Sequence, residues 1–160
     1  MKKLLFDEVT HSTDETEALG ARIAELARRE GIDFAALYGD LGTGKTALTR
    51  GIASIYAPGA YVRSPTFTIV NEYTAAGRNE TSLPVFHFDM YRVTDEDSLD
   101  SIGFYDYFAR GGFIVTEWSE NIPWALPEEY IEVKLERLSD DERRITAVAV
   151  GRERKDDDTC

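Results

Sequence analysis

The spacing of apolar residues near the N-terminus predicts a helix with defined ends. Residues 19–27 place Leu and Ile side chains on one helical face. Ahead of this stripe, Ser12 followed by Glu15 matches a capping box, which marks a helix start. Gly31 follows the last apolar position and is placed to end the helix. A helix from about residue 12 to residue 31 is therefore expected.

A strand and a second helix are predicted next along the chain. The short apolar run over residues 34–38 favours a buried strand. A glycine-rich turn follows it, and the helix after the turn begins at about Lys45. This helix should stop near Tyr56, because Pro58 and Gly59 come directly after it.

Strands predominate in the rest of the pattern. FTIVNEY (67–73) and LPVFHFD (83–89) flank a segment rich in turn residues and predict an antiparallel hairpin. A helical stretch is expected from Thr94 to about residue 109, where two glycines follow. FIVTEW (113–118) has the composition of a buried strand.

YIEVKLERL (130–138) and RRITAVAVG (143–151), separated by SDDE, form a second hairpin candidate. Strands that alternate with helices predict an α/β fold with a mixed, mainly parallel sheet flanked by helices and extended by antiparallel hairpins. We expect one domain over residues 1–150. Residues 151–160 mix charges without apolar content, and we predict a disordered tail there.

Composition narrows the classes of function. No run approaches the roughly 20 apolar residues of a membrane span, and the N-terminus has no secretory signal, so we expect a cytosolic protein. Cys160 is the only cysteine and there are 2 histidines, which disfavours a disulfide framework or a zinc site. The formal net charge of −12 disfavours a protein that grips nucleic acid by itself.

The turn before the second helix carries the strongest chemical signal. Gly39, four further residues and Gly44-Lys45-Thr46 satisfy the phosphate-binding pattern G-x-x-x-x-G-K-[ST]. Glycines allow backbone N–H groups to enclose an anion, and the following helix adds its positive end. Lys45 should reach the β- and γ-phosphates, and the Thr46 hydroxyl should bind Mg²⁺. The pattern predicts a P-loop NTPase fold.

The nucleotide and its reaction are less constrained. The [NT]-K-x-D stretch typical of guanine-reading proteins does not occur late in the chain, which favours ATP. Phosphoryl transfer needs a metal and a group that orients the attacking oxygen. Asp89 and Glu117 each close a buried strand candidate and are the carboxylates we select; either could also be a solvated strand end.

Three further features are more ambiguous. Ser64-Pro65-Thr66 lies where P-loop proteins place a switch segment, although alone it is also an ordinary turn. His87 lies two residues before Asp89 and is interpreted as a buried histidine with satisfied hydrogen bonds. Trp118 is interpreted as a core or rim residue.

Together the stretches GDLGTGKTALTRG, SPTFTIVNEY, FHFDMYR, GFYDYF and EWSENIP resemble, in order and spacing, the bacterial TsaE family. The resemblance runs from about His11 to Leu138. Proteins of that family are small ATPases of tRNA threonylcarbamoyladenosine synthesis. It implies an ATPase that energises or resets the enzyme complex modifying the adenosine next to the anticodon in tRNAs that read codons starting with A.

The resemblance also implies roles for individual residues. Thr46 and Glu117 match Mg²⁺ ligands, Asp89 matches an essential acidic position, and Asp89, Glu117 and Lys45 form the catalytic set. HSTDET resembles a stretch that contacts the adenine, which adds Thr13. The residues expected to bind ATP are Thr13, Gly39, Asp40, Leu41, Gly42, Thr43, Gly44, Lys45, Thr46, Ala47, Thr66 and Trp118.

The implied partners are a threonylcarbamoyltransferase subunit and its inactive paralogue, proteins of the TsaD and TsaB type, with tRNA contacted only through the complex and no membrane involved. ATP turnover should be weak in the isolated protein and stimulated by these partners. Two other functions stay open: a small-molecule kinase with the same phosphate loop, and a nucleotide-controlled binding module whose hydrolysis is incidental. The scattered arginines of the chain do not form the clustered lid typical of such kinases.

Overall fold

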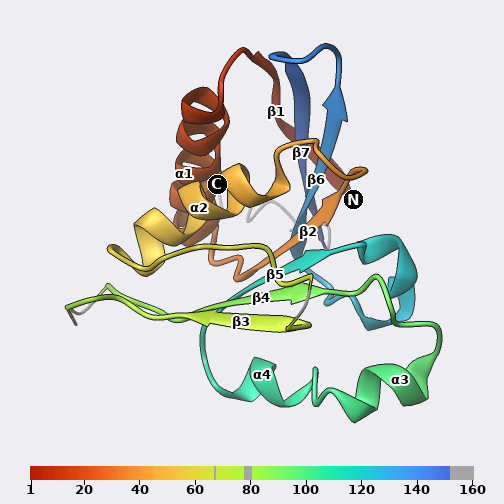
Figure 1. Ribbon diagram of the computed structural model, residues 1–160. Coiled ribbons are helices and arrows are strands. Elements are labelled where there is room, and N and C mark those ends of the chain that lie inside the picture. Colours follow the sequence, from red (N-terminus) through yellow and green to blue (C-terminus); the bar gives the residue numbers. More distant parts are fainter. Residues whose placement is uncertain (67, 78–80, 152–160) are drawn as a thin grey trace, which may run out of the picture.

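A computed structural model describes residues 1–66, 68–77 and 81–151 as a single sheet with helices on both faces (Figure 1). The sheet has seven strands in the order β1-β7-β6-β2-β5-β4-β3. Their bounds are β1 Lys2–Thr10, β2 Phe34–Tyr38, β3 Val70–Tyr73, β4 Val85–Asp89, β5 Phe113–Glu117, β6 Tyr130–Arg137 and β7 Arg143–Val150. The helices are α1 Thr13–Glu30, α2 Lys45–Tyr56, α3 Glu96–Ser101 and α4 Asp106–Ala109, with 3₁₀ turns η1 Ser119–Asn121 and η2 Pro123–Ala125.

The sheet is evenly mixed, which corrects the expectation of a mainly parallel one. Among the described strands, the pairs β2–β5, β2–β6 and β4–β5 are parallel, and β1–β7, β6–β7 and β3–β4 are antiparallel. Both predicted hairpins, β3–β4 and β6–β7, are confirmed. The predicted tail lies, apart from Gly151, outside the described residues.

Strand β1 is absent from the sequence-based prediction. It pairs with β7 along its length, from Lys2 opposite Val150 to Thr10 opposite Arg143. The register shifts between Leu4 and Phe6, so the side-chain alternation reverses within the strand. This irregularity removes the period-2 signal by which a strand is recognised in sequence.

Both ends of α1 follow the prediction. The Ser12 hydroxyl accepts a hydrogen bond from the Glu15 N–H, and the Glu15 carboxylate accepts from the N–H of His11 rather than from that of Ser12. Gly31 ends the helix with φ 70°, a conformation that glycine adopts without strain.

The single helical stretch predicted for residues 94–109 is two short helices, α3 and α4. Gly103 lies between them with φ 69°, and this left-handed residue redirects the chain. Asp95, not Thr94, is the N-cap of α3, and its carboxylate accepts the Ser98 N–H at 2.8 Å.

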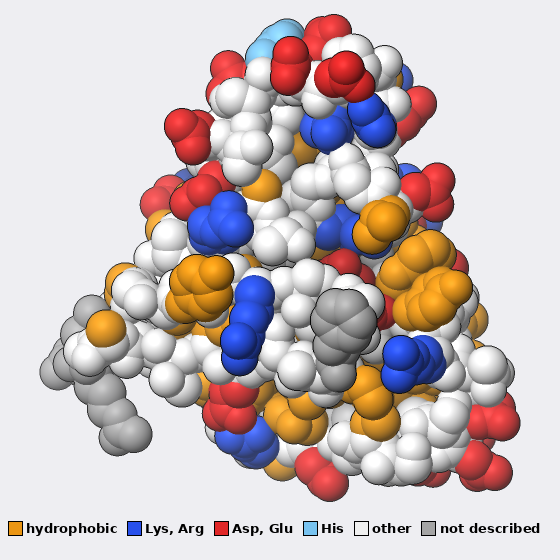
Figure 2. Space-filling view, in the orientation of Figure 1, with side chains coloured by type: hydrophobic (Ala, Val, Ile, Leu, Met, Phe, Trp, Pro, Cys, Tyr) orange, Lys and Arg blue, Asp and Glu red, His pale blue; other side chains and the backbone are white. Residues whose placement is uncertain are grey.

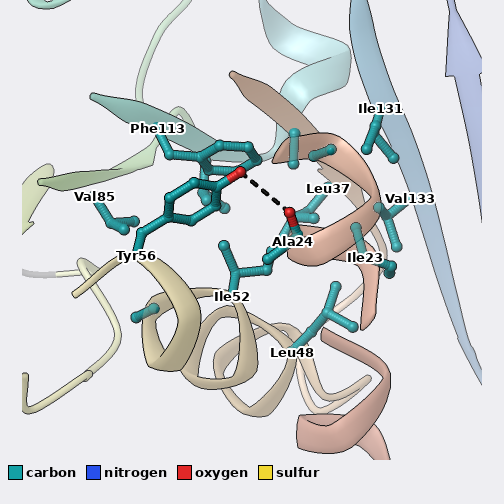
Figure 3. Close-up of a cluster of buried hydrophobic side chains, with 14 of the residues drawn as sticks. Ile23, Ala24, Leu37, Leu48, Ile52, Tyr56, Val85, Phe113, Ile131 and Val133 are labelled. Atoms are coloured by element: carbon teal, nitrogen blue, oxygen red, sulfur yellow. Dashed lines mark hydrogen bonds between the residues drawn. The ribbon is translucent and has the colours of Figure 1, made fainter. Parts of the chain in front are cut away.

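Each face of the sheet buries its own apolar cluster. The cluster under α1 and α2 contains Leu19, Ile23, Leu48 and Ile52 packed on alternate residues of the central strands (Figure 3). The cluster on the opposite face is rich in phenylalanine and lies under the segment that carries α3 and α4 (Figure 1). No helix in residues 1–66, 68–77 and 81–151 is long and apolar enough to cross a membrane.

Helices α1 and α2 cross so closely that two positions accept only glycine. A Cβ on Gly51 would lie 1.9 Å from the carbonyl oxygen of Glu17, and one on Gly20 would lie 2.2 Å from that of Leu48. Both obstacles are backbone atoms and cannot rotate away. Because α2 begins at the glycine-rich turn, this crossing also holds the turn close to the start of α1.

We expect Gly51→Ala to destabilise the protein by about 1–3 kcal/mol, because the added methyl group must push the two helices apart. Alanine's higher helix propensity, about 0.5–1 kcal/mol, offsets only part of this cost. Urea unfolding followed by circular dichroism measures the change.

Gly77→Ala is the control, since a Cβ there meets no atom of the described residues within 4 Å. It should change the unfolding free energy by less than about 0.5 kcal/mol. Equal effects of the two substitutions would contradict the tight crossing.

Candidate functional site

The turn from Gly39 to Gly44 connects β2 to α2 and depends on its glycines. Gly42 has φ 79° and Gly44 has φ 100°, values that residues with a side chain rarely adopt. A Cβ on Gly39 would lie 2.7 Å from the carbonyl oxygen of Leu135 in β6. The Thr43 hydroxyl donates to the Asp40 carbonyl at 2.8 Å and braces the turn from within.

The first turn of α2 is open to a ligand. Its N-cap, Gly44, has no side chain to accept the first N–H groups of the helix. Gly44, Lys45, Thr46 and Ala47 all line one cavity beside the turn. Uncapped N–H groups and the positive end of the helix dipole favour an anion in this place.

Lys45 is almost buried, with 7% of its surface exposed, and lies among three groups. Its Nζ donates to the Gly39 carbonyl at 2.6 Å and lies 3.8 Å from Oε1 of Glu117. The same ammonium lies 5.0 Å from the centre of the Trp118 ring, a cation–π contact. The ammonium is therefore held at the mouth of the turn.

Asp89 and Glu117 end their strands as predicted, and the order of strands in the sheet makes them direct neighbours. They are opposite each other in the parallel register of β4 and β5. Glu117 is 5% exposed and contacts both Lys45 and Nε2 of His87. Asp89 is half-buried, and its Oδ1 accepts the N–H of Tyr91 at 2.9 Å.

After Glu117 the chain turns sharply. Trp118 has φ 56°, and Ile69 has φ 69°; these are the two positive-φ residues other than glycine in the described part of the chain. A bulky or β-branched residue in this conformation is strained. Ile69 accepts the N–H of Asp89 at 2.8 Å, so both strained residues adjoin the carboxylate pair.

These segments surround one cavity of about 420 Å³, within the range of small-molecule sites. On the face shown in Figure 2, basic side chains are dispersed among apolar and uncharged ones, and acidic side chains lie mostly at the periphery. The residues that line the cavity are Ser12, Thr13, Thr16, Leu41, Gly42, Gly44, Lys45, Thr46, Ala47, Ser64, Thr66, Asp89, Glu117, Trp118, Asp140, Asp141 and Arg143.

Most residues selected from the sequence meet in this cavity. Three do not line it: Gly39, Asp40 and Thr43 border a separate hollow beside Leu135. Tyr38 borders the same hollow, and its pKa is raised to about 12, first by burial and then by the nearby Tyr130, so the phenol stays neutral.

Some of the other lining residues have no local signal in the sequence. Asp140 and Asp141 belong to the turn between β6 and β7, and Arg143 begins β7. They reach the cavity only because β6 pairs with β2. Ser64 joins the selected Thr66 through hydroxyl groups 2.7 Å apart. Adjacency created by sheet order cannot be read from a local pattern.

Comparisons with known proteins agree on one family. A model of the family "Threonylcarbamoyl adenosine biosynthesis protein TsaE" matches residues 10–145. The Bacillus subtilis tRNA threonylcarbamoyladenosine biosynthesis protein TsaE is 39% identical over 151 residues, covering 94% of this chain and 89% of that protein. The Haemophilus influenzae protein of the same name is 42% identical over 113 residues, covering 71% of this chain and 68% of its own. The crystal structure of Bacillus subtilis YdiB superimposes with a TM-score of 0.69 at 35% identity, covering 94% of this chain and 88% of that one.

Neutralising Glu117 should lower the free energy of unfolding more than neutralising Asp89 does. We expect Glu117→Gln to cost about 3 kcal/mol, the low end for a buried ion pair that loses one partner, because Lys45 keeps only part of its compensation. Asp89→Asn should cost less than about 1 kcal/mol, since an amide oxygen can still accept the Tyr91 N–H.

Urea unfolding of both variants at pH 7, without nucleotide or metal, measures the difference. The two substitutions are matched, because each replaces one carboxylate by its amide at the end of a neighbouring strand. Equal costs would show that the burial of Glu117 has no bearing on stability.

Proposed function

The chain belongs to the TsaE family of tRNA threonylcarbamoyladenosine biosynthesis proteins, and on this premise we propose that it binds and hydrolyses ATP with Mg²⁺ in that pathway. The single observation that carries the proposal is the meeting of Lys45 and Glu117 at an open helix start. A cation, uncapped N–H groups and a carboxylate in one cavity are what a nucleotide with a bound metal requires.

The triphosphate is held by the turn and the first turn of α2. Backbone N–H groups of Gly42 and of residues 44–47, which line the cavity, donate to phosphate oxygens. Lys45 adds a full positive charge at the β- and γ-phosphates. Thr13, at the start of α1, lines the same cavity and borders the base and ribose.

The residues present fit Mg²⁺. The Thr46 hydroxyl and the Glu117 carboxylate line the cavity, and oxygen atoms are the ligands that this ion prefers. In the described residues no group of three or more His, Cys, Asp or Glu gathers as a metal site. Mg²⁺ in nucleotide sites is bound by one or two protein oxygens together with phosphates and water, and it neutralises the β- and γ-oxygens there.

Hydrolysis requires water to be oriented towards the γ-phosphorus. The water oxygen forms a bond to the γ-phosphorus while the bond between that phosphorus and the β–γ bridging oxygen breaks. The products are ADP and inorganic phosphate. Asp89, half-buried beside Glu117, accepts a hydrogen bond from the water. Ser64 and Thr66 line the same cavity, and in this proposal their hydroxyl groups respond to the γ-phosphate.

The pathway supplies the partners in this proposal: a threonylcarbamoyltransferase subunit and its inactive paralogue, with tRNA contacted through them. The net charge of −12 supports an indirect role towards tRNA, because phosphate contacts need clustered cations. Hydrolysis then resets the transferase complex after a modification cycle.

Phosphate release from ATP by the purified protein should be slow and should rise by roughly tenfold or more when both partner proteins are added, as expected when a partner completes a phosphoryl-transfer site. A coupled phosphate assay at fixed Mg²⁺ measures it. A rate unaffected by the partners would contradict the proposed role. Transfer of phosphate to an acceptor instead of water would identify a kinase.

Lys45→Ala should weaken ATP binding by about tenfold or more, because a hydrogen bond to a charged group contributes about 1.5–3 kcal/mol. Isothermal titration calorimetry measures the affinity. Lys134→Ala is the matched control, since that lysine is exposed on β6 and lines no part of the cavity. Comparable losses in both variants would remove Lys45 from the phosphate site.

A further inference from the structure

A chain of buried polar side chains links Glu117 to the segment that precedes Thr66. Nε2 of His87 contacts Oε2 of Glu117, and Nδ1 of His87 lies 3.0 Å from the Tyr73 hydroxyl. That hydroxyl lies 2.7 Å from the carbonyl oxygen of Arg63. His87 is fully buried and Tyr73 is 4% exposed, so the chain runs through the protein interior.

The hydrogen positions follow from the partners. A carboxylate only accepts, so Nε2 of His87 carries the hydrogen that faces Glu117. The Tyr73 hydroxyl has one proton and two acceptors within reach, Nδ1 of His87 and the Arg63 carbonyl. Burial raises the pKa of Tyr73, so this proton is retained at neutral pH. The hydroxyl donates to one of these two acceptors at a time, and its oxygen also accepts the Arg63 N–H at 3.3 Å. It therefore contacts both the imidazole and the backbone of Arg63.

Asn71 fastens the same segment from a second side. Its amide nitrogen donates to the Arg63 carbonyl at 3.1 Å, and its amide oxygen accepts the Thr68 hydroxyl at 2.6 Å. Arg63 and Thr68 lie on either side of Ser64 and Thr66, which line the nucleotide cavity. The hydrogen-bonded network of His87, Tyr73 and Asn71 thus reaches Glu117 at one end and the segment around Ser64 and Thr66 at the other.

Burying polar side chains costs free energy, so a role in packing alone does not explain why polar residues occupy these positions. A histidine, a tyrosine and an asparagine each lose hydration in the interior and need partners there. The flanking residues of His87 on β4, Phe86 and Phe88, are fully buried phenylalanines in the cluster on the opposite face. An apolar residue at position 87 would fill the same space, but it would not hold Glu117.

We propose that His87 and Tyr73 are positioning residues that couple the Glu117 carboxylate to the segment 63–66, so that binding of a divalent cation at Glu117 and the placement of Ser64 and Thr66 are linked. The proposal rests on the proposed function, since it assigns the cation to that site. His87 fixes one oxygen of Glu117 and leaves the other, Oε1, facing the cavity and Lys45. Tyr73 transmits any displacement of the imidazole to the Arg63 carbonyl.

Tyr73→Phe tests the link, because it removes one hydroxyl and keeps the ring. The dependence of binding of the β,γ-imido analogue of ATP on Mg²⁺ concentration is measured by calorimetry for each protein. In Tyr73→Phe, the Mg²⁺ concentration for half-maximal enhancement should rise by roughly tenfold, as is typical when the groups that support a metal ligand are lost. Analogue binding without Mg²⁺ should stay unchanged.

Tyr56→Phe is a matched control. Tyr56 is 2% exposed, and its hydroxyl also makes a buried hydrogen bond, donating to the Ala24 carbonyl at 3.2 Å (Figure 3). It lies in the cluster under α1 and α2 and lines no part of the nucleotide cavity. This variant should lose similar stability but keep the Mg²⁺ dependence of the unaltered protein.

Trypsin cleavage after Arg63, which is exposed, reports on the segment itself. With Mg²⁺ and the analogue, cleavage should slow in the unaltered protein and in Tyr56→Phe, and stay fast in Tyr73→Phe. His87→Gln restores a donor towards Glu117 but not the contact with Tyr73, so it should retain most of the Mg²⁺ affinity and lose the protection from trypsin.

The outcomes separate the two proposals. If the unaltered protein shows no effect of Mg²⁺ on analogue binding, the proposed function itself fails. If it does show the effect, and Tyr73→Phe matches Tyr56→Phe in both Mg²⁺ dependence and trypsin protection, the coupling is overturned while the proposed function stands.

Discussion

The burial of two opposite charges, Lys45 and Glu117, is the constraint on which the rest of the site depends. Removing an ion from water costs several kcal/mol, and attraction between the two charges offsets this only with good geometry and further hydrogen bonds. Each group therefore has a second partner, the Gly39 carbonyl for Lys45 and His87 for Glu117. The loop conformation supplies the carbonyl that Lys45 contacts, and the register of β4 and β5 brings His87 and Glu117 together.

Two separate parts of the fold bring the pair together. Lys45 is carried by α2, whose position is fixed by the glycine contacts with α1. Glu117 ends β5 in the centre of the sheet, where its neighbours β2 and β4 are both parallel to it. Because the carboxyl ends of parallel strands lie at one edge, the turn after β2 and the carboxylates of β4 and β5 converge there. The antiparallel strands widen the sheet and add a further wall to the cavity.

Much of this arrangement could be predicted where the signal is local. The phosphate-binding pattern places Lys45 and Thr46, and the apolar runs before Asp89 and Glu117 place those residues at strand ends. Strand β1 could not be predicted, because its register shift hides the alternation. The turn at Asp140 could not be assigned to the site either, since its proximity depends on the order of strands. The partners of His87 depend on which residues of β3 and β5 lie beside β4, and the sequence does not encode this locally.

The turn after Glu117 has a consequence of another kind. The left-handed conformation of Trp118 places its indole against the Lys45 ammonium and 5.0 Å from the Tyr91 ring. The chain has 2 tryptophans, and the other, Trp124, lies in η2 with 41% of its surface exposed. With Trp124 replaced by phenylalanine, the tryptophan fluorescence comes from one indole, that of Trp118, which contacts Lys45. The fluorescence of Trp118 therefore reports on changes inside the cavity that this residue lines.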